Sequence, residues 1–183
     1  MTHAELADDL RGLLTTWPAP TAGQEALRVE YLAHLDAHEA ATAKTGPPTH
    51  FTASCLVVDA GAEHVLLTLH PKVGRWLQFG GHLEKDDSSV AAGALREALE
   101  ESGLTAATLQ LRPGLAQLDR HALGSGFTRC TEHLDLRWIA TAADGAEPVV
   151  SDESDDVAWW PVDALPEDMD DSLRSLVELA GRV

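Results

Sequence analysis

The chain has 183 residues, and 44% of them are apolar, an ordinary share for a globular domain with a buried core. Its 30 acidic residues outnumber its 13 lysines and arginines, so the formal net charge is −17 at pH 7. A field of this sign repels nucleic-acid backbones and anionic membranes, so neither is expected as a partner. The sequence contains no apolar run of about 18 or more residues and no signal-peptide pattern. We therefore expect a cytoplasmic protein.

Residues 1–45 are predicted to be helical, and residues 1–48 to form an N-terminal extension of a main domain at 49–183. Thr2 is expected to cap a first helix, and the prolines at 18 and 20 to end it. Thr21 and Gln24 fit a capping box for a second helix. Two roles for this helical pair stay open, namely covering the core or making a dimer contact, and we favour the first.

Short apolar segments, rich in β-branched residues, follow at 51–58 and 64–69. The turn residues at 59–62 predict that the two segments form a hairpin. Both segments are apolar throughout, so we expect both strands to be covered on two faces. The cysteines Cys55 and Cys130 each fall in a strand-like segment, and we interpret them as buried free thiols of a reducing compartment.

The most informative stretch of the sequence is GGHLEKDDSSVAAGALREALEESGL, at residues 80–104. Its second half predicts a helix that begins at an N-cap supplied by Asp87 or Ser88 and ends at Gly103. Helical spacing places three carboxylates within a stripe about 100° wide. These belong to Glu97, Glu100 and Glu101. We expect this stripe to lie on the side opposite the buried face.

Such crowding destabilises a helix, since each like-charge pair three or four residues apart costs about 0.2–0.5 kcal/mol. Arg96 is placed to pair with Glu100 and would relieve one acid. A divalent cation would relieve all three, and oxygen ligands of this kind suit Mg²⁺. A solvated acidic helix face is the plainer interpretation of three clustered acids. The two glycines ahead of the helix and the Arg96–Glu97 pair favour the cation.

Strands are also predicted at about 109–123 and 129–142. In the second, the side chains of His133, Asp135 and Arg137 alternate with apolar ones and share one face. This polar face is expected either to be solvated or to form a substrate wall. An acidic loop at 151–156 and a strand carrying Trp159 then precede a terminal helix at 170–180.

The stretch from Gly81 to Leu104 resembles the Nudix box, GX5EX7REUXEEXGU, in which U is a bulky apolar residue. The match is good from Arg96 onward, with Ala98 as a small residue at a U position. Asp87 stands where the box has Glu, with eight rather than seven residues before Arg96. Three possibilities stay open for the role of Asp87: it caps the helix, it orients Arg96, or it does neither.

The resemblance implies an α/β fold, a Nudix-type α/β/α sandwich with a mixed sheet. It also implies a Mg²⁺-dependent hydrolase, with Mn²⁺ as a substitute, that cleaves a pyrophosphate linkage in a nucleoside diphosphate derivative or a related phosphoanhydride. In this interpretation Glu97, Glu100, Glu101 and the Gly81 carbonyl bind the metal, and Arg96 holds the carboxylates in register. The metal would neutralise substrate charge and lower the pKa of water. Glu97, Glu101 and Glu153 are the candidates for the general base.

The substrate itself is not readable from the sequence beyond a small nucleotide or pyrophosphate. Basic and aromatic residues outside the helix are candidates for contacting its phosphates or sugar, although ordinary loop or surface roles are open for each. They are Lys72, Arg75, Trp76, Arg120, His121, His133 and Arg137. The resemblance also suggests a homodimer.

Two other functions remain. One is an inactive Nudix-fold module that binds nucleotides or has a regulatory role. The intact acidic cluster argues against it. The other is an isopentenyl-diphosphate-isomerase-like enzyme, but the Cys-Cys-Ser-His motif of such enzymes is absent around Cys55.

Overall fold

A computed structural model describes residues 1–124, 129–150 and 154–181 of the chain. It contains one mixed sheet of eight strands and four helices in these residues. In chain order the elements are α1 (His3–Thr16), α2 (Ala22–Ala37), β1 (Thr49–Val58), β2 (His64–His70), β3 (Arg75–Leu77), β4 (Phe79–His82), α3 (Val90–Ser102), β5 (Leu109–Leu111), β6 (Gln117–Ala122), β7 (Glu132–Ala142), β8 (Asp156–Pro161) and α4 (Asp171–Ala180).

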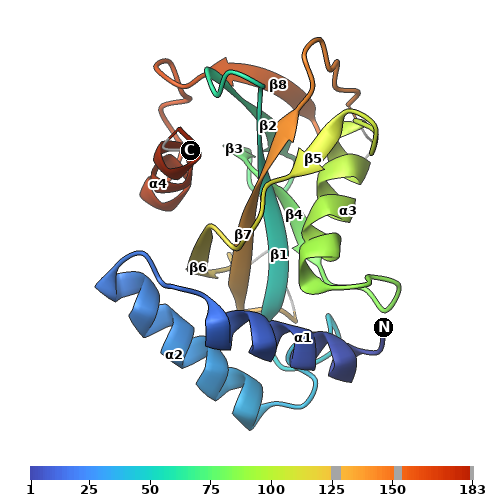
Figure 1. Cartoon of the computed structure of the whole chain (residues 1–183), viewed down its shortest axis with the longest axis vertical. Coiled ribbons are helices and arrows are strands. Elements are labelled where there is room, and N and C mark those ends of the chain that lie inside the picture. Colours follow the sequence, from blue (N-terminus) through green and yellow to red (C-terminus); the bar gives the residue numbers. More distant parts are fainter. Residues whose placement is uncertain (125–128, 151–153, 182–183) are drawn as a thin grey trace.

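The centre of the sheet is a parallel pair formed by the two longest strands, β1 and β7, which stay in register from Thr49 and Glu132 to Val58 and Thr141. The other edge of β1 pairs with β4 and then with β2, both antiparallel. Likewise, the outer edge of β7 pairs with β6 and then with β5. Each central strand thus carries two successive partners on one edge, and the sheet curls as a result (Figure 1).

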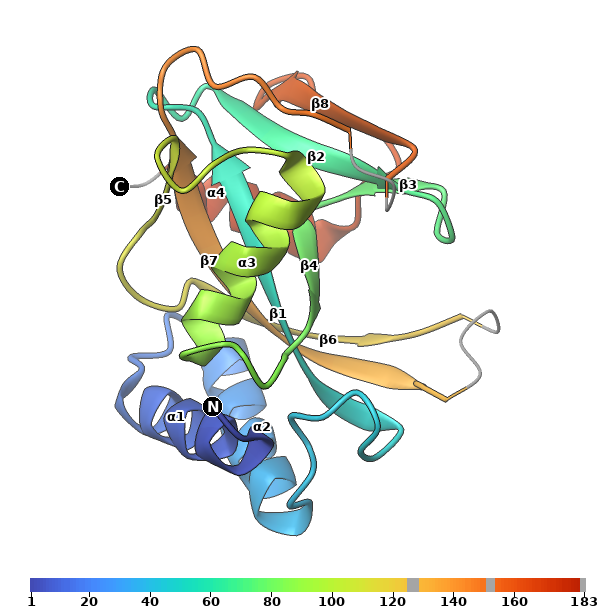
Figure 2. The same ribbon diagram turned by 90° about the vertical axis from the view of Figure 1, so that its right-hand side faces the viewer.

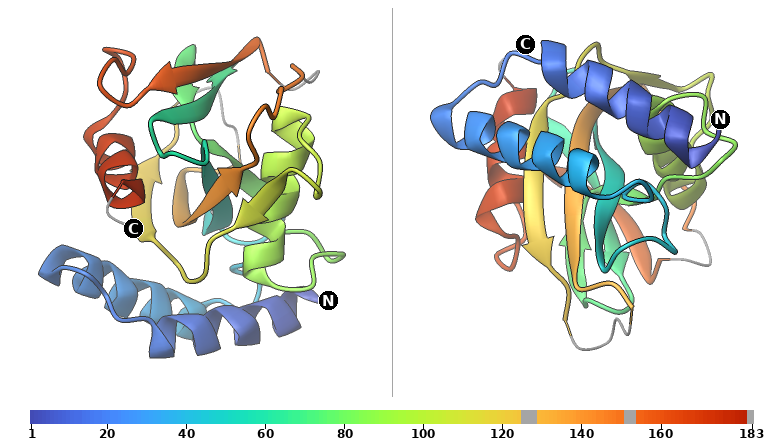
Figure 3. Two further views of the ribbon diagram at one scale, coloured as in Figure 1. Left: turned by 45° about the horizontal axis from the view of Figure 1, so that its top comes forward. Right: turned by 90° about the horizontal axis from the view of Figure 1, so that it is seen from below.

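Helices cover the sheet from three directions. Helix α3 lies on one side and α4 on the other, so the predicted α/β/α arrangement with a mixed sheet is confirmed (Figures 1 and 2). Helices α1 and α2 lie side by side across one end of the sheet (Figure 3, right). Their buried residues Leu6, Leu10 and Tyr31 belong to the same hydrophobic cluster as Phe51 of β1. The two N-terminal helices therefore pack on the core of the sheet.

The expected caps of the N-terminal helices are present, with one difference. Thr2 and Glu5 form a capping box at α1, and the Thr21 side chain accepts a hydrogen bond from the Gln24 amide at α2. The Gln24 side chain, however, pairs with the backbone of Leu118, donating to its carbonyl at 2.9 Å and accepting from its N–H at 2.7 Å. Gln24 thereby ties α2 to the backbone of β6.

Burial along the central strands confirms one expectation and corrects another. Strand β1 is buried on both faces, as its continuous apolar sequence predicted. Strand β7 was expected to expose one polar face, yet the side chains of Asp135 and Arg137 are each about 3–4% exposed.

Cys55 is buried as expected, whereas Cys130 is only half-buried; both are free thiols. Among the described residues, no helix has the length and apolar character needed to cross a membrane.

Candidate active site

The acidic helix α3 begins and ends at identifiable caps. The Ser89 side chain accepts a hydrogen bond from the Ala92 amide at 3.0 Å and is the N-cap, so the expectation that Asp87 or Ser88 would cap the helix is wrong. Gly103 ends the helix as expected, with a φ of 67° that glycine adopts without strain. A loop at 83–89 therefore joins β4, which carries the two glycines, to the helix.

The direction of the carboxylates differs from the expectation. Glu97 and Glu101 are half-buried and point toward the sheet, with the Glu97 side chain only 12% exposed, whereas Glu100 is 60% exposed. At about 100° per residue, the buried residues of α3 include Gly93 on one side of these acids and Ala94 on the other. The helix is therefore rotated relative to the predicted core face, so that two of its three acids lie between α3 and β4.

Two glycines of β4 make this rotation possible. The Gly80 amide donates a hydrogen bond to Glu101 Oε2 at 3.2 Å. A Cβ atom at Gly81 would lie 2.7–2.8 Å from the carboxylate atoms of Glu97, and one at Gly80 would lie 2.3 Å from Ser54 Cβ. Because no other residue leaves this space, the carboxylates can lie directly against the backbone of β4.

Arg96 links the acids to the loop before the helix. Its guanidinium donates to Asp87 at 2.8 Å, to Glu97 and Glu100 at 3.0 Å each, and to the His82 carbonyl at 3.0 Å. The expected pairing with Glu100 is present, but Arg96 contacts three carboxylates rather than one. Burial alone would lower the pKa of Arg96, but the hydrogen bonds and charges of Asp87 and Glu97 outweigh burial and raise that pKa.

Asp87 is buried and holds Arg96 in place. Besides the guanidinium, its carboxylate accepts a hydrogen bond from the Glu84 amide at 2.8 Å. Of the three alternatives for Asp87, the geometry selects orientation of Arg96. Both carboxylate oxygens are occupied by these donors, so Asp87 fixes the arginine and the arginine fixes the glutamates.

The donor set fits a hard divalent cation. Glu97, Glu100 and Glu101 project from one helix, and two of them rest in the cradle formed by Gly80 and Gly81. Carboxylate and carbonyl oxygens are the ligands that Mg²⁺ takes in proteins. One guanidinium among four carboxylates, those of Asp87 and the three glutamates, leaves the cluster negative, which favours a cation.

The candidate substrate residues at β3 lie at an edge of the sheet. Lys72 and Arg75 are exposed, in and just after the turn that joins β2 to β3. The Trp76 ring packs edge-on against Trp160 of β8, with 5.2 Å between ring centroids. Trp159 packs against the opposite hydrophobic cluster, so the two tryptophans of β8 lie on opposite faces of that strand.

Arg120, His121 and Arg137 are engaged with acids of neighbouring elements. Arg120 pairs with Glu30 and Glu132 at the surface. Asp119 accepts hydrogen bonds from both His121 and Arg137, each at 2.8 Å. Burial would raise the pKa of Asp119, but the contacts with His121 and Arg137 lower it to about 2.

Arg137 belongs to a buried polar network. It also donates to Asp135 at 3.0 Å and to the Ser172 hydroxyl of α4 at 2.9 Å. Asp135 in turn accepts from Thr52 and Ser54 of β1. This network joins β1, β6, β7 and α4, which is neither of the two roles foreseen for the polar face of β7.

His133 lies beside this network, with its ring 5.5 Å from that of His121, in a group that the sequence analysis missed. Its ring is 5.2 Å from that of His50 and 5.3 Å from that of His82. Burial lowers the pKa of His82 to about 3 and that of His133 to about 4, so both imidazoles are neutral at pH 7. The sequence did contain one signal for this group of histidines, namely His82, which directly follows the two glycines of the acidic motif.

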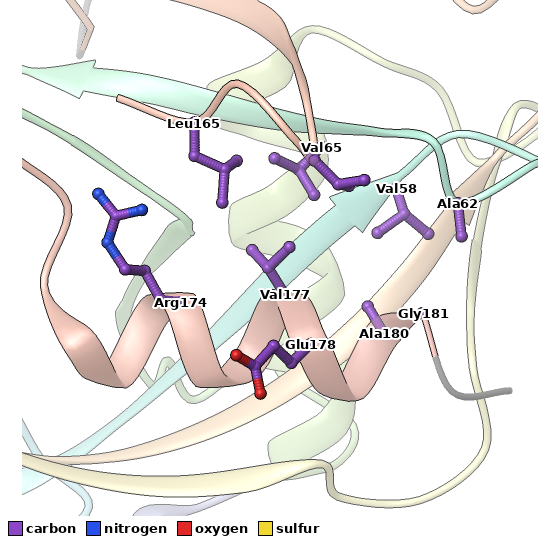
Figure 4. A pocket seen from close by; sticks show the side chains of 10 residues that line it. Val58, Ala62, Val65, Leu165, Arg174, Val177, Glu178, Ala180 and Gly181 are labelled. Atoms are coloured by element: carbon purple, nitrogen blue, oxygen red, sulfur yellow. The ribbon is translucent and has the colours of Figure 1, made fainter. Parts of the chain in front are cut away.

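Apolar cavities occur elsewhere in the described residues. One of about 400 Å³ lies between α4 and the β1–β2 hairpin, lined mainly by Val58, Val65 and Val177, with Arg174 at its margin (Figure 4). It is on the side of the sheet opposite α3, so it is remote from the carboxylates (Figure 1).

Glu153, a candidate general base, lies outside the described residues.

Comparison with known proteins agrees with this geometry. A family model described as the NUDIX domain matches residues 48–180. A NUDIX-family hydrolase from Clostridium perfringens is 25% identical over 72% of this chain and 93% of that chain, with a TM-score of 0.51. Because the family model covers most of the chain, the protein belongs to the Nudix family. It is a Nudix hydrolase.

More distant structures share the fold. An Ap4A hydrolase from C. elegans is 19% identical, covering 70% of this chain and 93% of its own, with a TM-score of 0.56. A MutT protein from Methanosarcina mazei Go1 is 20% identical, covering 74% of this chain and 95% of its own, with a TM-score of 0.53. These two likenesses show the architecture of the sheet and helices.

Proposed function

We propose that the protein hydrolyses a pyrophosphate linkage in a nucleoside diphosphate derivative or related phosphoanhydride and requires Mg²⁺, with Mn²⁺ as a substitute. The observation that carries the proposal is the position of Glu97 and Glu101 against the glycine backbone of β4, with Arg96 beside them. Glu97, Glu100, Glu101 and the Gly81 carbonyl would hold the ion. When bound, Mg²⁺ neutralises phosphate charge and makes water more acidic.

The residues of the chain have separable tasks in this proposal. Gly80 and Gly81 admit the carboxylates, and the Gly80 amide orients Glu101. Arg96 and Asp87 keep the acids in a fixed geometry, which is the usual role of groups that contact metal ligands. The general base must lie within about 3 Å of the attacking water, and half-buried Glu97 and Glu101 are the described candidates.

Replacing Glu97 or Glu101 with Gln tests the assignment. Each change keeps the side-chain shape and removes the charge, so we expect turnover to fall by on the order of 10²-fold or more. The melting temperature should remain close to that of the parent, and exposed Glu147→Gln is the matched control. Near-normal rates in both single variants, at every Mg²⁺ concentration used, would contradict the proposal.

A substrate screen narrows the class. The panel contains nucleoside diphosphate sugars, dinucleoside polyphosphates, oxidised nucleoside triphosphates and coenzyme A, with phosphate release as the readout. Dinucleoside polyphosphates are included because one structure of the same fold is an Ap4A hydrolase. Calorimetry with the same compounds separates turnover from binding: tight binding without phosphate release would indicate an inactive module.

We also propose that residues 1–48 are an extension that supports the catalytic unit at 49–183. The family match begins at residue 48, and helices α1 and α2 pack across one end of the sheet. The Asp9 carboxylate of α1 accepts a hydrogen bond from the Val90 amide at 2.8 Å, at the start of α3. The extension thus contacts the helix that carries the acids.

Among the candidate substrate residues, we propose substrate contact for one group and a packing role for another. Lys72, Arg75 and Trp76 stand at the edge of the sheet, where an anionic substrate would reach the two exposed cations. Arg120, His121 and Arg137 already have acidic partners, so we assign them first to the packing of β6, β7 and α4.

A further inference from the structure

Four potential metal ligands of another kind converge at the end of β4. One ligand atom from each of His50, His82, Cys130 and His133 lies within 4.8 Å of the others. We propose that these four side chains bind a transition-metal ion of the zinc class. The site uses none of the carboxylates of α3, and its occupancy can be measured without any assay of hydrolysis.

The register of the sheet brings three of the ligands together. His50 and Thr52 are two residues apart on β1, so their side chains project from the same face. His133 of β7 pairs with His50 on one edge of β1, and His82 of β4 pairs with Thr52 on the other. The three imidazoles are therefore placed on one face by three adjacent strands.

Cys130 joins this group just before β7. The Thr131 amide donates to the Pro48 carbonyl at 2.9 Å, which continues the β1–β7 pairing by one residue beyond the strands. This hydrogen bond fixes the chain next to Cys130, whose thiol is half-buried. The fourth ligand is thus held by the same ladder as the other three.

The nature and spacing of the donors favour zinc over magnesium. Zn²⁺ binds histidine nitrogen at about 2.0–2.1 Å and cysteine sulfur at about 2.3 Å, so four ligands around it lie about 3.3–3.7 Å apart. The ligand atoms here lie within 4.8 Å of one another, which is about 1 Å more, and small side-chain rotations can close this difference. Imidazole and thiolate are ligands of Zn²⁺, whereas Mg²⁺ prefers oxygen.

The hydrogen bonds of His50 prepare it to bind a metal. His50 Nδ1 lies 2.9 Å from the Pro47 carbonyl, and since a carbonyl can only accept, Nδ1 carries the proton. The lone pair of His50 is therefore on Nε2, which faces His82 Nε2 at 3.0 Å. Metal-binding histidines commonly donate their other ring nitrogen to a carbonyl in this way.

His133 provides an independent observation. Its Nε2 atom is buried and has no hydrogen-bond partner among the described residues. Buried ring nitrogens are normally paired, and an exception calls for a specific explanation. A plain cluster of packed histidines would leave this nitrogen unsatisfied, whereas a metal ion shared with His50 and His82 would account for the convergence.

An ion here would also fix the end of β4. His82 follows Gly81 directly, and its carbonyl accepts a hydrogen bond from Arg96 at 3.0 Å. Binding through His82 would therefore hold together β1, β4 and β7 next to the residues that orient the acids. We assign the ion a structural task, with no part in the reaction.

Metal analysis of the whole, untagged chain tests the proposal. The protein is purified without chelators, and bound metal is measured by mass spectrometry. We expect about one equivalent of zinc per chain, retained on dialysis and removed by a strong chelator. Re-addition at roughly 100 times the dissociation constant should raise the melting temperature by about 5–10 °C.

Cobalt substitution identifies the ligands. Co²⁺ in the site should show the visible spectrum of a tetrahedral ion and a near-ultraviolet band from thiolate coordination. The band should disappear in Cys130→Ser and persist in Cys55→Ala, which removes the other thiol. His133→Gln should lower metal content, whereas His38→Gln, at an exposed histidine, should not.

Two results would overturn the proposal. One is a chain that holds less than about a tenth of an equivalent of zinc and gains no thermal stability when zinc is added. The other is undiminished binding in a folded Cys130→Ser/His133→Gln variant, which would place the ion elsewhere. Circular dichroism establishes folding, and Cys130→Ser, at a half-buried position, is the variant that retains most contacts.

Discussion

At the scale of single residues, the central feature is the contact between Arg96 and its acidic neighbours. Helical spacing predicted that Glu97, Glu100 and Glu101 share a stripe, and they do. The direction of that stripe was not predictable from spacing, because it depends on which strand packs against α3. Gly80 and Gly81 leave room for two carboxylates on the side that a helical wheel reserves for apolar residues.

The role of Asp87 leads to a prediction about its removal. Asp87→Asn weakens the contact with Arg96, so we expect activity to fall about 10–100-fold and stability by about 1.5–3 kcal/mol. Steady-state kinetics and thermal melting measure the two effects. Asp86→Asn, at the exposed neighbouring position, is the control. If Asp87→Asn lowered stability with kcat unchanged, Asp87 would have no influence on the glutamates.

At the scale of elements, the position of α3 depends on contacts far away in the sequence. The existence of this helix, its end at Gly103 and the neighbouring β1–β2 hairpin were predictable from local patterns. Its contact with α1 was not predictable, because nothing in the sequence of either helix indicates that the two pack together. The same holds for β7, whose alternating polar residues indicate a solvated face until α4 and β1 supply partners for them.

Helix α1 is expected to stabilise the start of α3. The Asp9 carboxylate accepts from the Val90 amide, one of the amides that a helix cannot satisfy internally. Asp9→Ala should cost about 0.5–2 kcal/mol of stability, as does the loss of an N-cap. Asp8→Ala, at an exposed position in the same helix, is the matched control in thermal or urea unfolding. Equal stability of the two variants would remove this support for the role of the N-terminal extension.

At the scale of the whole molecule, one network of buried charges joins the sheet to α4. Asp119, Asp135 and Arg137 come from β6 and β7, and Ser172 from α4 donates to Asp119. The individual residues were visible in the sequence, but their pairing required the register of β6 with β7. For that reason the sequence suggested substrate contacts at positions that the fold uses for packing.

This network predicts a component of acid sensitivity. The pKa of Asp119 is lowered to about 2 from 3.8, so its stabilising effect is complete above pH 4 and is lost as the pH falls toward 2. The shift corresponds to about 2 kcal/mol. Asp119→Asn should therefore melt at lower temperature at pH 7, and its difference from the parent should narrow below pH 4. Asp163→Asn, at an exposed loop position, is the control, and a difference that is independent of pH would refute this origin.

The parallel pairing of β1 with β7 has a consequence for how the chain acquires its structure. Thr52 and Asp135, which face each other in this pair, are 83 residues apart. Contacts this distant form only after a long segment has been closed, which slows folding. On the ribosome, β1 and the acidic helix emerge well before β7, so the backbone N–H and C=O groups on one edge of β1 stay unpaired during synthesis of the intervening segment. Faster synthesis of the last third of the chain, or binding of a chaperone to the incomplete chain, should therefore raise the yield of folded protein.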